Sequence, residues 1–188
     1  TGALSLIAGG AINNSNKLQA KHGDILLNAG GNISNVSELT KADEGEVSFT
    51  AGGAVVNQSK IEAGKNVSLK AEADISNAAA ITAEQDIFLR ADKALKNTKA
   101  LTATNGKATL TASGDLDNTG AITAKENIVL TSSAGSVNNG TDTTAANLMS
   151  TSGDILLTAL DALTNNGALS AAGRVSLNAV NGLASSGA

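Results

Sequence analysis

Glycine pairs are the first residues in this sequence whose type and spacing could support chemistry. Gly9-Gly10, Gly30-Gly31 and Gly52-Gly53 each follow an apolar run, as the glycines of a phosphate-binding loop would. Such a loop also needs a helix behind it, whose first backbone amides point at the phosphates. No helical 3.6-residue period follows any of the pairs, and charged residues stand at the equivalent positions Glu72 and Asp92. The glycines are therefore predicted to ease a bend in the chain, not to bind a nucleotide.

Aspartates at the bends of the sequence pattern are of a type that could bind calcium. Asp24, Asp115 and Asp154 lie at such bends. Calcium-binding β-rolls use a nine-residue repeat rich in Gly and Asp, so that carboxylates converge on one ion from successive turns. The repeat in this chain is about 20 residues long, and only some copies carry an aspartate there. We interpret the three as solvated turn residues, and we predict no metal ion and no cofactor.

Residues suited to catalysis are few. His22 is the single histidine, it lies beside Lys21, and the chain has no Cys, Trp or Tyr. Polysaccharide lyases and glycosidases built on β-helices need clustered carboxylates or a basic residue in a cleft, with aromatic platforms for sugar rings. His22 is therefore predicted to be an exposed bystander, and the chain is predicted not to be an enzyme. Without cysteine, disulfides and thiolate metal sites are excluded.

The overall composition argues against two classes of partner. The formal net charge is -4 over 188 residues, and no run of Lys or Arg is present, so nucleic acid is not expected. The longest apolar runs, such as residues 25–27, are far shorter than the roughly 18 residues of a membrane span, so no direct membrane insertion is expected. With only two Phe and one Met, the core is predicted to be narrow and aliphatic.

The elements that position these residues come from an internal repeat. Nine copies of one pattern follow one another, exemplified by the sequence GDILLNAGGNISN that starts at residue 23. Successive copies lie 20 to 22 residues apart, except for one spacing of 27 residues. Apolar and polar residues alternate in each copy, which predicts a strand with one buried face. The central apolar column of that strand is Leu6, Leu27, Phe49, Leu69, Leu89, Leu110, Leu130, Leu157 and Leu177.

Two more strands are predicted in each copy. A second apolar column starts at Ile12, and a third starts at Leu18 and is usually followed two residues later by alanine. In the second copy the third column is assigned to Leu39, which puts Lys41 where alanine is usual. No two-residue Asn-Gly or Asp-Gly turn joins long alternating runs, so hairpins are not expected. Each strand is instead predicted to pair with its counterpart in the next copy.

An asparagine column follows the second apolar column by two residues. An inward asparagine at a bend can exchange amide hydrogen bonds with the layers above and below, where water does not reach. We predict a structural ladder that also sets the register of the coils, and not a ligand site. Ser185 breaks the column in the last copy. Its members are Asn14, Asn35, Asn57, Asn77, Asn97, Asn118, Asn139 and Asn165.

Together these columns predict an all-β fold, a parallel β-helix of about nine coils with three short strands per coil. A single domain covers residues 1–188 and is expected to be a segment of a longer chain. The one long spacing marks a longer loop at residues 140–147. Loops on regular solenoids often carry binding, but this loop is small and polar, so a tolerated insertion is the simpler interpretation.

Outward positions of the first strand carry charges and scattered apolar side chains. Lys70 and Arg90 lie in adjacent copies, and each is followed two residues later by an acid, Glu72 or Asp92. Pairs of this kind at a surface contribute little to stability. Outward apolar residues are either ordinary exposed aliphatics or part of a contact patch. They include Leu26, Phe88, Val129 and Leu156.

The repeat resembles the haemagglutinin repeats of filamentous haemagglutinin-like exoproteins, including the stalks of contact-dependent growth inhibition toxins. The resemblance rests on nine consecutive copies over residues 2–188, with aliphatics, alanine, a glycine-rich bend and asparagine at the same offsets. It implies a right-handed parallel β-helix on a Gram-negative cell surface, exported through an outer-membrane transporter partner and folded outside the cell.

The function implied by the resemblance is display. The segment is expected to be the structural shaft of a secreted adhesin or toxin-delivery protein. Other regions of the parent chain would contact the receptor on a host or target cell. The alternative is that the segment itself is an adhesive module that binds a receptor or glycan.

Overall fold

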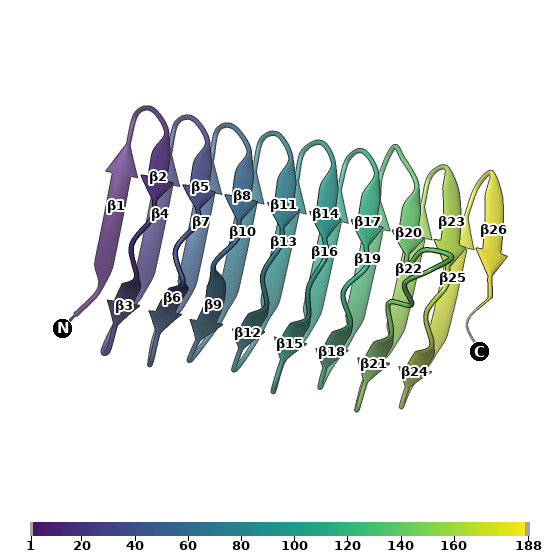
Figure 1. Cartoon of the computed structure of the whole chain (residues 1–188). Coiled ribbons are helices and arrows are strands. Elements are labelled where there is room, and N and C mark those ends of the chain that lie inside the picture. Colours follow the sequence, from purple (N-terminus) through teal and green to yellow (C-terminus); the bar gives the residue numbers. More distant parts are fainter. Residues whose placement is uncertain (1, 187–188) are drawn as a thin grey trace.

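The computed structural model describes residues 2–186, and all the regular structure in that range is β-strand. The chain winds into a solenoid whose coils are stacked side by side, with the two ends of the chain at opposite ends of the stack (Figure 1). Each coil contributes one strand to each of three parallel sheets, except that the last coil, within the described residues, has no strand in the third sheet. The prediction of an all-β parallel β-helix with three strands per coil is confirmed.

The first sheet has nine strands and contains the longest strand of each coil, with five residues. Its strands are β1 (Leu4–Ala8), β4 (Ile25–Ala29), β7 (Val47–Ala51), β10 (Val67–Ala71), β13 (Ile87–Ala91), β16 (Ala108–Ala112), β19 (Ile128–Ser132), β22 (Ile155–Ala159) and β25 (Val175–Ala179).

The second and third sheets contain shorter strands, of three or four residues. The second comprises β2 (Ile12–Asn14), β5 (Ile33–Asn35), β8 (Val55–Asn57), β11 (Ile75–Asn77), β14 (Leu95–Asn97), β17 (Leu116–Asn118), β20 (Val137–Asn139), β23 (Ala162–Asn165) and β26 (Gly182–Ser185). The third comprises β3 (Leu18–Ala20), β6 (Leu39–Ala42), β9 (Lys60–Ala63), β12 (Ile81–Ala83), β15 (Leu101–Ala103), β18 (Ile122–Ala124), β21 (Leu148–Ser150) and β24 (Leu169–Ala171).

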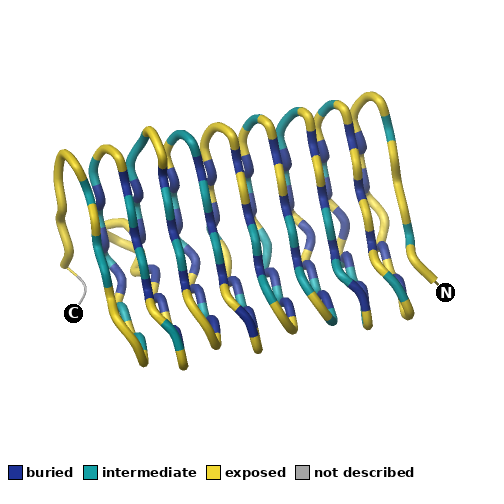
Figure 2. The backbone as a smooth tube through the Cα atoms, turned by 180° about the vertical axis from the view of Figure 1, so that it is seen from behind, coloured by how far each residue is buried: buried dark blue, intermediate teal, exposed yellow. Residues whose placement is uncertain are grey.

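The interior is filled by the inward side chains of all three sheets. In β4 the alternation is strict: Ile25, Leu27 and Ala29 are buried, and the two residues between them are exposed. Phe49 is fully buried in the same column as Leu27. Burial follows the strands of the middle coils, whereas the bends and the last coil are exposed (Figure 2). One coil cannot bury its inner face alone, so stability comes from stacking.

Backbone pairing continues through the bends that join the sheets. At the first bend of coil 2, for example, the amide of Gly30 donates to the carbonyl of Ala8 at 2.9 Å, and that of Gly31 donates to Gly10 at 3.0 Å. A Cβ on Gly30 would collide with the carbonyl oxygen of Gly9 in the coil below. The glycine pair therefore permits a close approach of two backbones, in agreement with the predicted bend.

The register of the second coil differs from the sequence prediction. Leu39 is only partly buried, and Thr40 is the fully buried residue that pairs in register with Leu18. Ala42 then occupies the alanine position, and Lys41 points outward. The assignment of Leu39 and Lys41 to the inward columns is therefore wrong.

An extra residue after the ladder asparagine causes this shift. Asn35 and Thr40 are five positions apart, whereas Asn57 and Ile61 in the next coil are four apart. Since side chains alternate along a strand, one inserted residue moves each following side chain to the other face. The buried Thr40 hydroxyl is satisfied because it lies 3.2 Å from the Asn35 amide nitrogen.

Candidate functional site

The asparagine ladder runs through the interior at the ends of the second-sheet strands. Seven of its members are fully buried, and Asn14 in the first coil is 7% exposed. In every step the Nδ2 atom of one asparagine donates to the Oδ1 atom of the next, at 2.7–2.9 Å. The last step reaches the hydroxyl of Ser185 at 3.3 Å. The structure thus places all eight predicted ladder residues in one column.

From Asn35 to Asn165, the second proton of each ladder amide is also used. Asn77 Nδ2 donates to the carbonyl of Ala79 at 2.8 Å, and Asn97 Nδ2 donates to that of Lys99 at 2.8 Å. Across residues 2–186, every buried side-chain nitrogen or oxygen has a hydrogen-bond partner. The ladder therefore holds the bend after the second strand and keeps no polar group free for a ligand.

A further set of asparagines and aspartates joins neighbouring coils at the outer bends, a role that was not predicted from the sequence. Asp24 Oδ1 accepts the amide of Glu46 at 2.9 Å, and Asp115 Oδ1 accepts that of Ser136 at 2.9 Å. In each case the donor is the equivalent residue of the next coil. The other members of the set are Asn32, Asn66, Asp74, Asp86, Asn127, Asn147 and Asp154.

Asp24, Asp115 and Asp154 are exposed at bends, as the interpretation as solvated turn residues requires. Each also has a role that was not predicted, because it caps a backbone amide that no strand would otherwise pair. The signal was present in the sequence: an Asn or Asp immediately precedes the first inward residue of a strand, as in Asp24-Ile25 and Asn66-Val67. Within the described residues no three His, Cys, Asp or Glu side chains are grouped as metal ligands.

The longer loop at residues 140–147 is built on the ladder. Gly140 has a φ of 85° and opens the loop, and an antiparallel bridge between Thr141 and Thr144 closes it. Ala146 at its base is fully buried, and its carbonyl accepts the Nδ2 proton of Asn139 at 2.7 Å. The loop is therefore an ordered protrusion on the second sheet.

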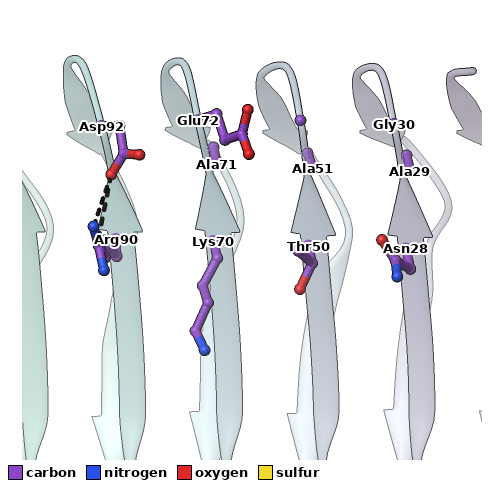
Figure 3. Close-up of a pocket in the computed structure, with 11 residues that line it drawn as sticks. Asn28, Ala29, Gly30, Thr50, Ala51, Lys70, Ala71, Glu72, Arg90 and Asp92 are labelled. Carbon is purple, nitrogen blue, oxygen red and sulfur yellow. Dashed lines mark hydrogen bonds and ion pairs between the residues drawn. The ribbon is translucent and has the colours of Figure 1, made fainter.

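On the outer face of the first sheet, one of the two base–acid spacings noted in the sequence forms an ion pair. Arg90 Nη2 lies 3.2 Å from Asp92 Oδ1. Lys70 does not pair with Glu72; its ammonium lies 5.8 Å from the centre of the Phe88 ring. Asn28, Thr50, Lys70 and Arg90 follow one another in register on successive coils (Figure 3).

A small ionic network lies on the outer face of the third sheet. Lys41 Nζ is 3.0 Å from Asp43 Oδ1 and 3.5 Å from Glu62 Oε2, and Lys60 also pairs with Glu62. The hydrogen bond from Lys60 lowers the pKa of Glu62, and the hydrogen bond from Lys41 lowers the pKa of Asp43. The bond to Asp43 raises the pKa of Lys41. These groups are partly exposed, so the network is a weak link between coils 2 and 3.

The other residues singled out in the sequence do not form one cluster. His22 is exposed at a bend, where its Nδ1 lies 2.9 Å from Glu44 Oε2. Val129 and Leu156 are registered neighbours on β19 and β22, and both are partly buried. Between residues 2 and 186, no helix has the length and apolar character needed to cross a membrane.

The fold and its polar ladder define a class: a repeat protein whose coils are parallel strands locked by inward asparagines. Comparison with known families identifies the repeat. The haemagglutinin repeat matches residues 1–59, 42–120, 97–179 and 150–188, which together span the chain. The chain belongs to the haemagglutinin repeat family. No curated protein and no solved structure matches it.

Proposed function

We propose that this segment is the structural shaft of a secreted surface adhesin or of a contact-dependent toxin-delivery protein. The observation that supports this proposal is the continuous register of the three sheets from β1 to β26, with polar groups inside the stack satisfied by the stack itself. Such a rod holds whatever lies beyond it at a fixed distance, since each coil adds about 4.8 Å. Membership of the haemagglutinin repeat family agrees with this role.

We further propose a location and two partners for the full-length protein. The protein is exported to the bacterial surface through an outer-membrane transporter, and other regions of the full-length protein contact a receptor on the host or target cell. Strands that pair only between coils suit this route, because the chain can pass through a pore unfolded and then pair coil by coil. Surface protein should disappear from cells that lack the transporter.

The shaft role is tested by removing whole coils from the full-length protein. Deletion of residues 128–174 joins Asn127 to Val175, which stands in the same column as Ile128 and Ile155, so the register is kept. We expect surface display to persist, the rod to shorten by about 10 Å, and distal binding or toxin delivery to be retained. Loss of cell binding in a protein that is still displayed would assign binding to the removed coils and refute a passive shaft.

A further inference from the structure

A hollow lies on the outer face of the first sheet, above two small side chains. In the column that contains Phe88, the registered residues of the preceding coils are Ser68, Ser48 and Leu26. Two serines stand between larger residues, and a depression of about 370 Å³ is lined by both serines and by Phe88. The regular stacking of the coils makes this depression a fixed shape.

The Phe88 ring is the feature of this hollow with the clearest ligand preference. The chain has two aromatic rings of the Phe, Tyr and Trp type, and the other, Phe49, is fully buried. The face of an aromatic ring is electron-rich and attracts the positively polarised C–H groups of a flat apolar surface. A sugar ring offers such a C–H face together with hydroxyl groups at its edge, and the serine hydroxyls and Asn66 line the same hollow.

The rim residues are held in place by bonds between coils. The amide of Asp86 donates to Asn66 Oδ1 at 3.1 Å, and the amide of Lys107 donates to Asp86 Oδ1 at 2.9 Å. The amide of Glu46, which also lines the hollow, donates to Asp24 Oδ1 at 2.9 Å. Hydrogen-bonding groups are thus positioned before a ligand arrives, which lowers the entropic cost of binding.

Lys70 gives the site its charge preference. Arg90 pairs with Asp92 and Lys107 lies 3.9 Å from Asp86, whereas Lys70 has no ion pair with any described carboxylate. The Lys70 side chain also lines a second hollow, of about 450 Å³, on the other side of the column formed by Asn28, Thr50, Lys70 and Arg90 (Figure 3). One ammonium-bearing side chain therefore lines both depressions.

The rim charges restrict the ligand to few negative groups. Four carboxylates, against three basic side chains, surround the two hollows, so a polyanion such as nucleic acid would be repelled. A ligand with a single carboxylate can approach Lys70 and keep its neutral rings over the serines and Phe88. The seven charged residues are Glu46, Lys70, Glu72, Asp86, Arg90, Asp92 and Lys107.

We propose that the two hollows form one binding site for an oligosaccharide that carries a carboxylate. In the free chain the Lys70 ammonium lies over the Phe88 ring. On binding, it moves to the carboxylate of the ligand, and one sugar ring takes its place on Phe88 above Ser48 and Ser68. This site does not depend on the shaft function: a shaft that only separates two regions needs no such surface, and a shaft that binds glycan still separates them.

The test measures binding of the full chain to an immobilised panel of oligosaccharides ending in uronic or sialic acid, each beside its carboxyl-reduced neutral counterpart. The variants use residues that the same columns already contain: Phe88→Thr follows Thr109, and Lys70→Thr follows Thr50. Lys96→Thr is the matched control, because Lys96 points outward on the second sheet in a column that also contains Thr164. Circular dichroism and thermal unfolding verify that all variants are folded.

We expect saturable binding to at least one acidic member of the panel, weakened about tenfold by Phe88→Thr and about fivefold by Lys70→Thr, and unchanged by Lys96→Thr. The parent chain should bind the carboxyl-reduced sugar with a lower affinity than the acidic sugar. This lower affinity should be about equal to the affinity of Lys70→Thr for the acidic sugar. Absence of binding across the panel, or equal binding by the parent and the folded Phe88→Thr chain, would overturn the site while leaving the shaft function intact. Binding to the acidic and neutral sugars alike would overturn the role of Lys70.

Discussion

Asn77 Nδ2 donates a hydrogen bond of 2.7 Å to Oδ1 of Asn97, and a second, of 2.8 Å, to the carbonyl of Ala79. Both asparagines are fully buried. One side chain thus joins two coils and fixes the bend inside its own coil. Removing it takes a donor away from Asn97 and an acceptor away from Asn57.

Asn77→Ala is therefore expected to destabilise the chain by about 2–4 kcal/mol, because buried partners lose their hydrogen bonds. Thr82→Ala, on the outer face of the third sheet, is expected to change the free energy of unfolding by less than about 0.5 kcal/mol. Urea unfolding of both variants measures the difference. Equal midpoints would show that the ladder is not a buried network.

The register of the second coil predicts unequal costs for two aliphatic truncations. Ile61 is fully buried, and Ile61→Ala is expected to cost about 2–5 kcal/mol. Leu39 is partly exposed because Thr40 occupies the inward position, so Leu39→Ala should cost less than about 1 kcal/mol. If Leu39→Ala lowered the free energy of unfolding as much as Ile61→Ala does, Leu39 would have to face inward.

The loop after β20 depends on one glycine conformation. Gly140 has a φ of 85°, and an added Cβ would lie 2.9 Å from the carbonyl oxygen of Thr144. Gly140→Ala is expected to destabilise the chain by about 1–2 kcal/mol. Gly9→Ala is the control, since a Cβ there meets no atom within 4 Å. Thermal unfolding compares the two, and a midpoint for Gly140→Ala no lower than that for Gly9→Ala would contradict the conformation.

The ionic network around Glu62 predicts a small acid-dependent loss of stability. The folded state lowers the pKa of Glu62 below its ordinary value of 4.5, chiefly through the hydrogen bond from Lys60. The contribution is therefore complete above about pH 5 and is lost as the pH falls through the folded pKa. Its size should be below about 1 kcal/mol, because the side chains are partly exposed.

Glu62→Gln isolates that contribution. The difference in unfolding free energy between the parent chain and Glu62→Gln should be constant from pH 7 to about pH 5 and should shrink at lower pH. It should also shrink in 1 M salt, where charges on the surface are screened. A difference that grows as the pH falls would have the wrong sign for a lowered pKa.

The sequence was sufficient for the fold because the repeat makes each inward column visible eight or nine times. The Asn column and the apolar columns are separated by fixed offsets, and strands that must pair with their own copies leave one arrangement. The second coil was misassigned because Leu39 is the more hydrophobic of two adjacent residues, whereas the extra residue after Asn35 turns Thr40 inward, where its hydroxyl is bonded to Asn35. Hydrophobicity alone does not predict that a hydroxyl is buried when its hydrogen bond is satisfied inside the protein.

The surface was less predictable than the core. Asp24 and its equivalents looked solvated because their role needs the amide of a residue one coil away, such as Glu46. Lys70 and Arg90 have the same spacing to an acid, yet Arg90 pairs with Asp92 and Lys70 lies over Phe88 of the next coil. Long side chains choose among several neighbours of similar energy, and a repeat pattern does not fix that choice.

The asparagine ladder also has a direction. From Asn14 to Asn165 every ladder amide donates toward the next coil in the chain, so the amide dipoles align along the rod. The two directions along the rod are therefore electrically different. A coil stacked head-to-tail on its neighbour brings a donor to each acceptor, whereas a reversed coil would bring oxygen against oxygen or N–H against N–H. The interior of this protein is a one-way chain of amides, and the ladder therefore selects the orientation of each coil as well as its register.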